Sequence, residues 1–292
     1  MKILVLGADG MLGHQLVASY RGRHQVYGTV RNSLAAYGAG SDHMPPVLLS
    51  EVDAKNVIGV ADAIDQISPD AVVNAIGIVK QRDDAKSAIE SIEVNSLFPH
   101  RLSEMCIKRG VRLVHMSTDC VFSGDTGGYQ DNDFADARDL YGRSKYMGEV
   151  CGDGVITLRT SIIGLELNRK KSLIEWFLAQ TGVIRGYRKA IYSGFTTLEM
   201  ARIIESLLKG APAQGVFNVS SEPVDKFSLL CGLRDRLVRN IEIVPDDEFV
   251  CDRSLDSTKF RQAFSYMPPR WSVMLDELAA QIRVRDGVEV GS

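Results

Sequence analysis

The first thirteen residues constrain the fold more than any other part of the sequence. A short apolar run at residues 2–6 leads directly into Gly7-Ala8-Asp9-Gly10-Met11-Leu12-Gly13, and a helical apolar pattern follows over 11–20. Glycines at these spacings permit a tight turn, let the backbone approach a pyrophosphate, and let helix and strand pack closely. The helix N-terminus then faces the phosphate charge. A strand, a glycine turn and a helix in this order predict a dinucleotide-binding fold.

Strand and helix patterns alternate through the first half of the chain. Apolar, β-branched runs predict strands at 2–6, 25–30, 71–75, 111–116 and 155–158. Between them, helical periodicity covers 11–20, 56–67, 85–108 and 141–150. Such alternation favours an α/β class, here a Rossmann-type doubly wound parallel sheet.

Shorter elements follow residue 159. The pattern predicts helices at 173–180, 198–209, 227–238 and from 271, and strands at 215–219 and 241–244. We therefore expect an NAD(P)-binding domain over 1–160 and a smaller α/β substrate-binding domain over 161–292, with some of its segments returning to the first domain. The two domains should leave a cleft between them.

Composition excludes several classes of partner. The 292 residues carry a formal net charge of −3 spread over both signs, which argues against nucleic acid and against a membrane surface. The five cysteines include no C-x-x-C pair, which fits a reducing cytoplasm, and no targeting or membrane-spanning segment is expected. His100 and His115 have no partners at ligand spacing, so no metal site is predicted. The oligomeric state stays open, with a homodimer as one option.

The end of the second predicted strand indicates which cofactor is preferred. NAD sites carry an acidic residue about 20 residues after the glycine motif to bind the ribose 2′-hydroxyl. Residues 14–41 contain no Asp or Glu, and Arg31 and Asn32 stand at the strand end instead. A guanidinium suits a 2′-phosphate, so NADPH is preferred over NADH, although Arg31 as a solvated surface charge remains an alternative.

Two segments carry groups suited to ketone reduction. Tyr141 and Lys145 lie one turn apart at the start of a predicted helix, where the lysine charge should favour the phenolate and reach the nicotinamide ribose. The predicted strand over 111–116 ends in Ser117 and Thr118, at the sheet edge where ligands bind in open α/β folds. Thr118, with or without Ser117, is placed to hydrogen-bond the substrate oxygen that Tyr141 protonates.

These motifs together resemble an extended short-chain dehydrogenase, closest to the dTDP-4-dehydrorhamnose reductase family. The resemblance rests on 7–13, 73–75 with 94–95, 117–124, 141–149 and 158–161. It implies Thr118, Tyr141 and Lys145 as the catalytic set. It also implies Asp53 near the adenine, Ala75 and Gly77 along the cofactor, and Asn95 supporting the Lys145 side.

The resemblance and the motifs together define the candidate site residues. Cofactor contacts are predicted at Gly7, Asp9, Gly10, Met11, Leu12, Arg31, Asn32, Asp53, Ala75, Ile76, Gly77, Asn95, Ser117, Tyr141 and Lys145. Substrate contacts are predicted at Asp119, Cys120, Val121, Ser161, Trp176 and Arg253.

The sequence departs from the family pattern near the expected sugar. Cys120 and Ile162 replace aromatic residues, and 138–140 and 193–197 differ from the usual motifs. Trp176 is a candidate replacement surface for stacking the nucleotide base, with a plain core role as the alternative. Arg253 is a candidate pyrophosphate ligand, with a surface charge as the alternative.

The resemblance implies reduction of the 4-keto group of a nucleotide-activated deoxysugar, for synthesis of cell-surface polysaccharide precursors. Sugar 4,6-dehydration is disfavoured because related dehydratases place an acidic residue where Cys120 stands. A nucleotide-sugar epimerase is an enzymatic alternative, and a non-catalytic NADP-binding regulatory subunit is an alternative of another class. The nucleotide, the hexose and the product stereochemistry stay open.

Overall fold

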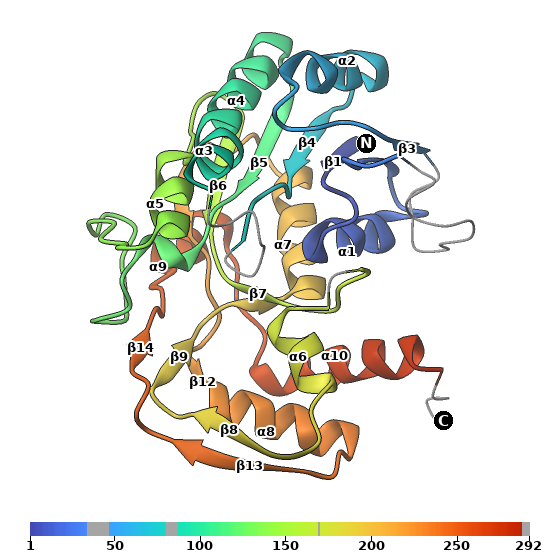
Figure 1. Cartoon of the computed structure of the whole chain (residues 1–292). Helices are drawn as coiled ribbons and strands as arrows, with labels where there is room; N and C mark the ends of the chain where they lie inside the picture. Colours follow the sequence, from blue (N-terminus) through green and yellow to red (C-terminus); the bar gives the residue numbers. More distant parts are fainter. Residues whose placement is uncertain (34–46, 80–86, 169, 288–292) are drawn as a thin grey trace.

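The centre of the molecule is a seven-stranded sheet in the order β11-β6-β5-β4-β1-β2-β3 (Figure 1). The computed structural model describes residues 1–33, 47–79, 87–168 and 170–287. All neighbouring strands of this sheet run parallel, which confirms the predicted α/β Rossmann class. The strands are β1 (Lys2–Leu6), β2 (Gln25–Thr29), β3 (Val47–Leu49), β4 (Ala71–Asn74), β5 (Arg112–Met116), β6 (Val155–Arg159) and β11 (Gly215–Asn218).

The strand order reverses beside β1. This strand pairs with β2 on one side and with β4 on the other, so the chain leaves it toward opposite edges of the sheet. A crevice opens at the carboxyl ends of the strands at such a reversal, and ligands of open α/β sheets bind there.

Helices cover both faces of the sheet. Side chains of α1 (Met11–Tyr20) and α7 (Thr197–Lys209) pack in one apolar core with β1. On the other face, α2 (Val57–Ile67) and α4 (Phe98–Arg109) share a second core. In Figure 1 the two pairs stand on opposite sides of the strands. Among the described helices, none is long and apolar enough to cross a membrane.

A third core lies below the sheet in Figure 1. Its main elements are α6 (Leu173–Leu178), β8 (Gly182–Tyr187), α8 (Lys226–Leu237), β13 (Ile241–Asp246) and α10 (Trp271–Arg285). Short strands join this part to the rest, namely β7 (Ile162–Ile163), β9 (Ala190–Tyr192), β10 (Phe195–Thr196), β12 (Val224–Asp225) and β14 (Cys251–Asp252). The chain returns to the large sheet with α7, β11 and α9 (Thr258–Phe264). The domain boundary at residue 160 stays a prediction.

The long helix predicted over 85–108 is wrong in its middle, and residues 85 and 86 lie outside the described part of the chain. α3 (Ala88–Ser91) is followed by a π-helical segment, η3 (Ile92–Leu97), before α4 begins. Pro99 has no N–H to donate to the carbonyl of Asn95, which removes one α-helical bond there. Single π-turns are common at functional sites.

The predicted helix over 141–150 is also shorter than expected. α5 (Leu140–Met147) begins after Asp139, whose carboxylate accepts a hydrogen bond from Gly142 N at 2.9 Å. It ends before Gly148, where an added Cβ would lie 1.8 Å from the Asn95 carbonyl oxygen. Close backbone packing between α5 and η3 therefore depends on this glycine.

We expect Gly13→Ala to destabilise the fold. Alanine normally stabilises a helix relative to glycine, but a Cβ at Gly13 would lie 2.0 Å from the Gly7 carbonyl oxygen, and Gly7 has φ +80°. Forcing the backbones apart should lower the free energy of unfolding by about 1–3 kcal/mol in urea titrations. Gly10→Ala is the matched control, because its Cβ would lie 3.3 Å from the same oxygen. Equal unfolding midpoints for both variants and the unmodified chain would contradict this packing argument.

Candidate active site

Two cavities meet at the carboxyl edge of the sheet. The first, here called the loop cavity, is lined by the glycine loop, the end of β2 and the segment after β4. The second, the central cavity, has a volume of about 490 Å³ and is lined by the ends of β5 and β6, by α5 and by the smaller core. Gly10, Ala75, Ile76 and Gly77 line both, so the two cavities adjoin.

Most predicted cofactor residues lie in these cavities. The loop cavity is lined by Gly7, Asp9, Gly10, Arg31, Asn32, Asp53, Ala75, Ile76 and Gly77. The central cavity adds Met11, Leu12, Ser117, Tyr141 and Lys145. Thr29 also lines the loop cavity, and its hydroxyl accepts a bond from Gly7 N at 3.4 Å. Thr29 was not predicted from the sequence, although it is the last residue of β2.

Thr118 is held at the sheet edge by a short local network. Its hydroxyl accepts from Cys120 N at 3.1 Å and donates to Asp119 Oδ1 at 3.1 Å. This hydroxyl begins the 3₁₀ turn η4 (Asp119–Val121) and is buried. Asp119 is also buried, which raises its pKa, while Arg253 opposes that shift.

The Lys145 ammonium lies at the junction of the two cavities. Nζ donates to the Met116 carbonyl oxygen at 2.6 Å, and an added Cβ at Gly77 would lie 3.9 Å from Nζ. Burial lowers the pKa of Lys145 to about 8, and the nearby Glu149 charge works against that shift. The carbonyl at the end of β5 thus holds the Lys145 side chain in place.

The expected effect of Lys145 on Tyr141 is corrected by the structure. Burial raises the pKa of Tyr141, and the charges of Cys120 and Asp119 raise it further. The opposing influence comes from a hydrogen bond with Thr118. Because burial outweighs this opposing influence, the pKa of Tyr141 stays above its ordinary value and the phenol is held in its protonated form.

A buried ion pair that was not predicted from the sequence supports the segment that carries Ser117 and Thr118. Arg159 Nε and Nη2 donate to Glu149 Oε1 and Oε2 at 2.8 and 2.7 Å. Ser117 Oγ donates to the same Glu149 Oε1 at 2.7 Å. Both charged side chains are about 6% exposed, so the pair is desolvated. Glu149 and Arg159 both lie within the stretches that resemble the family, and this was the one signal in the sequence that could have identified them.

Asn95, a predicted cofactor contact, does not line either cavity, and its side chain is buried behind residues that do. Its amide accepts from Ile78 N at 2.9 Å and donates to Ile78 O at 3.0 Å, which fixes the segment after β4. Nδ2 also donates to Ser144 Oγ at 3.2 Å on α5. An added Cβ at Gly77 would lie 3.6 Å from Asn95 Oδ1. Asn95 therefore links the glycine side of the cavity to the helix that carries Lys145.

The predicted substrate residues separate into two groups. Asp119, Cys120, Ser161 and Arg253 line the central cavity. Val121 does not, because it is fully buried in a small core with Phe122 and Tyr129. Trp176 does not line the cavity either, and its side chain is 40% exposed on α6. The proposed stacking role of Trp176 is therefore not supported by its position.

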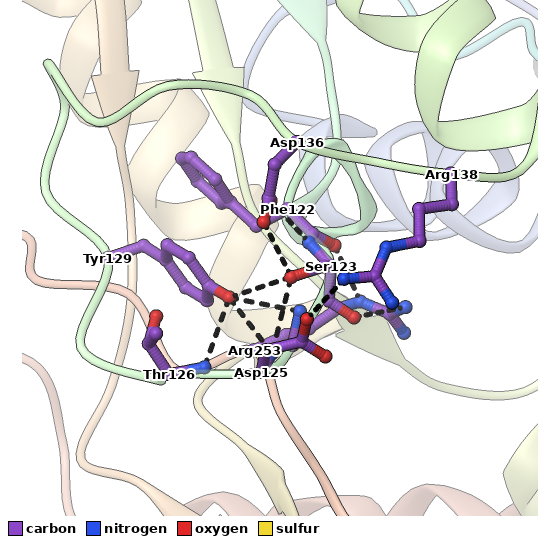
Figure 2. A network of polar contacts seen from close by, with 9 residues as sticks. Phe122, Ser123, Asp125, Thr126, Tyr129, Asp136, Arg138 and Arg253 are labelled. Atoms are coloured by element: carbon purple, nitrogen blue, oxygen red, sulfur yellow. Dashed lines mark hydrogen bonds and ion pairs between the residues drawn. The ribbon is translucent and has the colours of Figure 1, made fainter.

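Arg253 lines the central cavity and is hydrogen-bonded to the loop at Phe122 and Ser123, far from it in the sequence. Figure 2 shows its guanidinium beside the backbone of Phe122 and Ser123, where Nε and Nη2 donate to the two carbonyls at 2.9 and 3.0 Å. The same loop is stabilised by the Tyr129 phenol oxygen. This oxygen accepts hydrogen bonds from the backbone N–H groups of Gly124, Asp125 and Thr126. This network joins the C-terminal part to the segment that carries Thr118.

A family model described as the RmlD substrate binding domain matches residues 1–166. The chain belongs to this family. The membership confirms the resemblance found in the sequence. The matched RmlD region contains the glycine loop, Thr118, Tyr141 and Lys145, whereas Trp176 and Arg253 lie beyond it.

Individual relatives match this chain over half of its length or over nearly all of it. A dTDP-4-dehydrorhamnose reductase of Aggregatibacter actinomycetemcomitans is 27% identical over 96% of this chain and 98% of its own length. A dTDP-4-keto-6-deoxy-D-glucose reductase of Streptomyces niveus is 30% identical over 50% of this chain and 45% of its own length. The solved dTDP-4-dehydrorhamnose reductase of Bacillus anthracis in complex with NADP superposes with a TM-score of 0.78 at 20% identity, over 96% and 99% of the chains. That structure shows the same fold.

We expect the buried Lys145 to give this RmlD-family protein a distinct alkaline stability profile. Its folded pKa of about 8 lies below the ordinary value of 10.5, so the unfolded state binds more protons between these values. Burying the ammonium therefore destabilises the fold by its full amount below pH 8. This destabilisation decreases as the pH rises toward 10.5. Relative to Lys145→Met, the unmodified chain should gain unfolding free energy across this window.

Urea titrations of both proteins without ligand at pH 7.5 and 9.5 measure the difference. Lys108→Met, an exposed lysine on α4, is the control and should run parallel to the unmodified chain. A constant difference between Lys145→Met and the unmodified chain at both pH values would contradict the lowered pKa.

Proposed function

We propose that the chain is an NADPH-dependent reductase of the 4-keto group of a nucleotide-activated deoxysugar, acting in the synthesis of cell-surface polysaccharide precursors. One observation carries the proposal. Thr118, Tyr141 and Lys145 line a single cavity that is continuous with the glycine loop. A carbonyl held in the central cavity would therefore lie between proton donors and the cofactor groove.

The residues of the loop cavity fit NADPH. Gly7 and Gly10 line this cavity, and the N-terminus of α1 begins at Gly10. The exposed guanidinium of Arg31 lies at the end of β2, where an NAD site would hold a carboxylate. Arg31 and Asn32 would hold the 2′-phosphate, and Asp53 would lie near the adenine; NADH is the weaker alternative.

The side chains of the central cavity divide the chemistry between them. Bound NADPH supplies the hydride. The Tyr141 hydroxyl gives its proton to the substrate oxygen as negative charge develops there. The Thr118 hydroxyl would turn its proton from Asp119 Oδ1 to the same oxygen and so stabilise that charge. Lys145 keeps a positive charge at the junction of the cavities, and its bond to the Met116 carbonyl keeps Nζ in place.

Arg253 and Ser161 belong to the substrate side of this proposal. Arg253 lies in the cavity with part of its guanidinium on the carbonyls of Phe122 and Ser123, and a guanidinium has five N–H donors. Its remaining donors would bind the diphosphate of the substrate. Asp119, Cys120 and Ser161 would contact the sugar.

The alternatives drawn from the sequence gain no support from the site. An epimerase would re-use NAD, and the β2 end lacks the acidic residue that NAD prefers. A regulatory subunit needs no proton donor, yet Tyr141 and Thr118 line the same cavity. Fluorescence titration with NADPH followed by a panel of 4-keto nucleotide sugars separates the three: cofactor binding without turnover of any sugar would favour the regulatory subunit.

Location and assembly complete the proposal. A cytoplasmic location fits the five cysteines, all of which are free thiols. A homodimer is the assembly to test by light scattering.

Tyr141→Phe should remove most turnover while leaving NADPH affinity nearly unchanged. Loss of a positioned general acid typically lowers the rate about 10²–10⁴-fold. Steady-state kinetics and fluorescence titration measure the two quantities. Tyr146→Phe is the matched control, because it removes a hydroxyl from the same helix at a side chain that is 44% exposed. A wild-type rate in Tyr141→Phe would exclude this phenol as the proton donor.

Arg31→Ala should raise the KM for NADPH about tenfold or more and change the KM for NADH little, since only NADPH carries the 2′-phosphate. The ratio of the two KM values is the measurement. Arg101→Ala removes the same charge from the exposed surface of α4 and should leave both values unchanged. Equal increases for the two cofactors in Arg31→Ala would remove the assigned role.

A further inference from the structure

The segment after β13 contributes alternate residues to the central cavity. Phe249, Cys251 and Arg253 all line it, at positions i, i+2 and i+4. Cys251 begins β14, which pairs with β9, and extended chain directs alternate side chains to one side. This segment therefore forms one wall that runs from Arg253 toward β13 and the smaller core.

Phe249 presents an aromatic ring at this wall. Its side chain is 47% exposed, although it lines a cavity. The ring contacts Tyr187 at the end of β8, with the ring centroids 5.1 Å apart and the planes inclined by 52°. The contact supports the ring from one side and leaves part of its apolar surface in water. A flat ligand group would cover that surface at a gain in free energy.

Besides Lys145 and Lys171, two further cations line the cavity with Phe249. Arg253 is tied to the carbonyls of Phe122 and Ser123, close to the catalytic segment (Figure 2). Lys226 is the first residue of α8, and its side chain also lines the cavity. The helix N-terminus adds positive potential around it. The cavity therefore offers positive charge and an aromatic surface together.

The spacing along the wall suits a nucleotide. Four residues of extended chain span at most about 13 Å, which is the greatest backbone separation between Arg253 and Phe249. With a diphosphate at Arg253, a base attached through a pentose could reach a ring at that range. The sugar end would then point toward Thr118 and Tyr141.

We propose that Phe249, supported by Tyr187, is the surface on which the base of the nucleotide substrate stacks, with Lys226 beside the diphosphate. The proposal rests on the proposed nucleotide-sugar substrate. It gives to Phe249 the role that the sequence suggested for Trp176, which lies outside the cavity. Because every base has a π-face, stacking here should tolerate different bases.

Calorimetric titration of dTDP and of UDP into the NADPH-loaded full chain tests the proposal. Phe249→Ala should weaken the binding of both nucleotides about tenfold, which is within the range for one lost base-stacking contact. Phe249→Trp should retain wild-type affinity, and NADPH affinity and melting temperature should stay unchanged in both variants. Val250→Ala is the matched control, because its side chain is 65% exposed and does not line the cavity.

The result that overturns the proposal is wild-type affinity for both nucleotides in Phe249→Ala, or no binding of either nucleotide to the unmodified chain. Turnover of 4-keto nucleotide sugars by the unmodified chain is measured separately. If the unmodified chain turns over a keto sugar and Phe249→Ala binds nucleotides with unchanged affinity, the stacking role alone is excluded. If no keto sugar is turned over but Phe249→Ala binds nucleotides more weakly, the nucleotide site is supported and the reductase function is excluded.

Discussion

The contact between the first strand and the first helix sets the position of everything in the site. A Cβ at Gly13 would lie 2.0 Å from the Gly7 carbonyl oxygen, so α1 can begin directly at the end of β1 only because that atom is missing. This contact places the helix N-terminus at the sheet edge beside the strand reversal. The loop cavity, and its position beside the central cavity at Gly10 and Gly77, follow from it.

Desolvation governs the chemistry on the other side of that junction. Lys145 and Asp119 are buried and Tyr141 is partly buried, and this desolvation lowers the lysine pKa and raises those of the phenol and the carboxyl. The Ser117–Glu149–Arg159 network holds the strand end that presents Thr118. Because breaking such a buried pair leaves an uncompensated charge, these residues resist single replacement. The reactive groups are thus fixed before any ligand enters.

The sequence predicted the sheet well because its strands are local patterns. The first strand and the first helix match the structure at both ends, and the predicted runs at 25–30, 71–75 and 111–116 are each within one residue of β2, β4 and β5. The π-turn at Asn95 was missed because the apolar pattern continues through it. The short strands β7, β9, β10, β12 and β14 were missed because two or three residues carry no readable periodicity.

By itself, the sequence determined the Rossmann class, the glycine loop and the grouping of Thr118, Tyr141 and Lys145. Each of these depends on spacing within one segment or on the common edge of parallel strands. Only the tertiary structure decided that burial, rather than Lys145, dominates the pKa of Tyr141. It also decided that Phe249 and Lys226 line the cavity while Trp176 does not. These outcomes depend on contacts between segments far apart in the chain, and no local pattern encodes which surfaces meet.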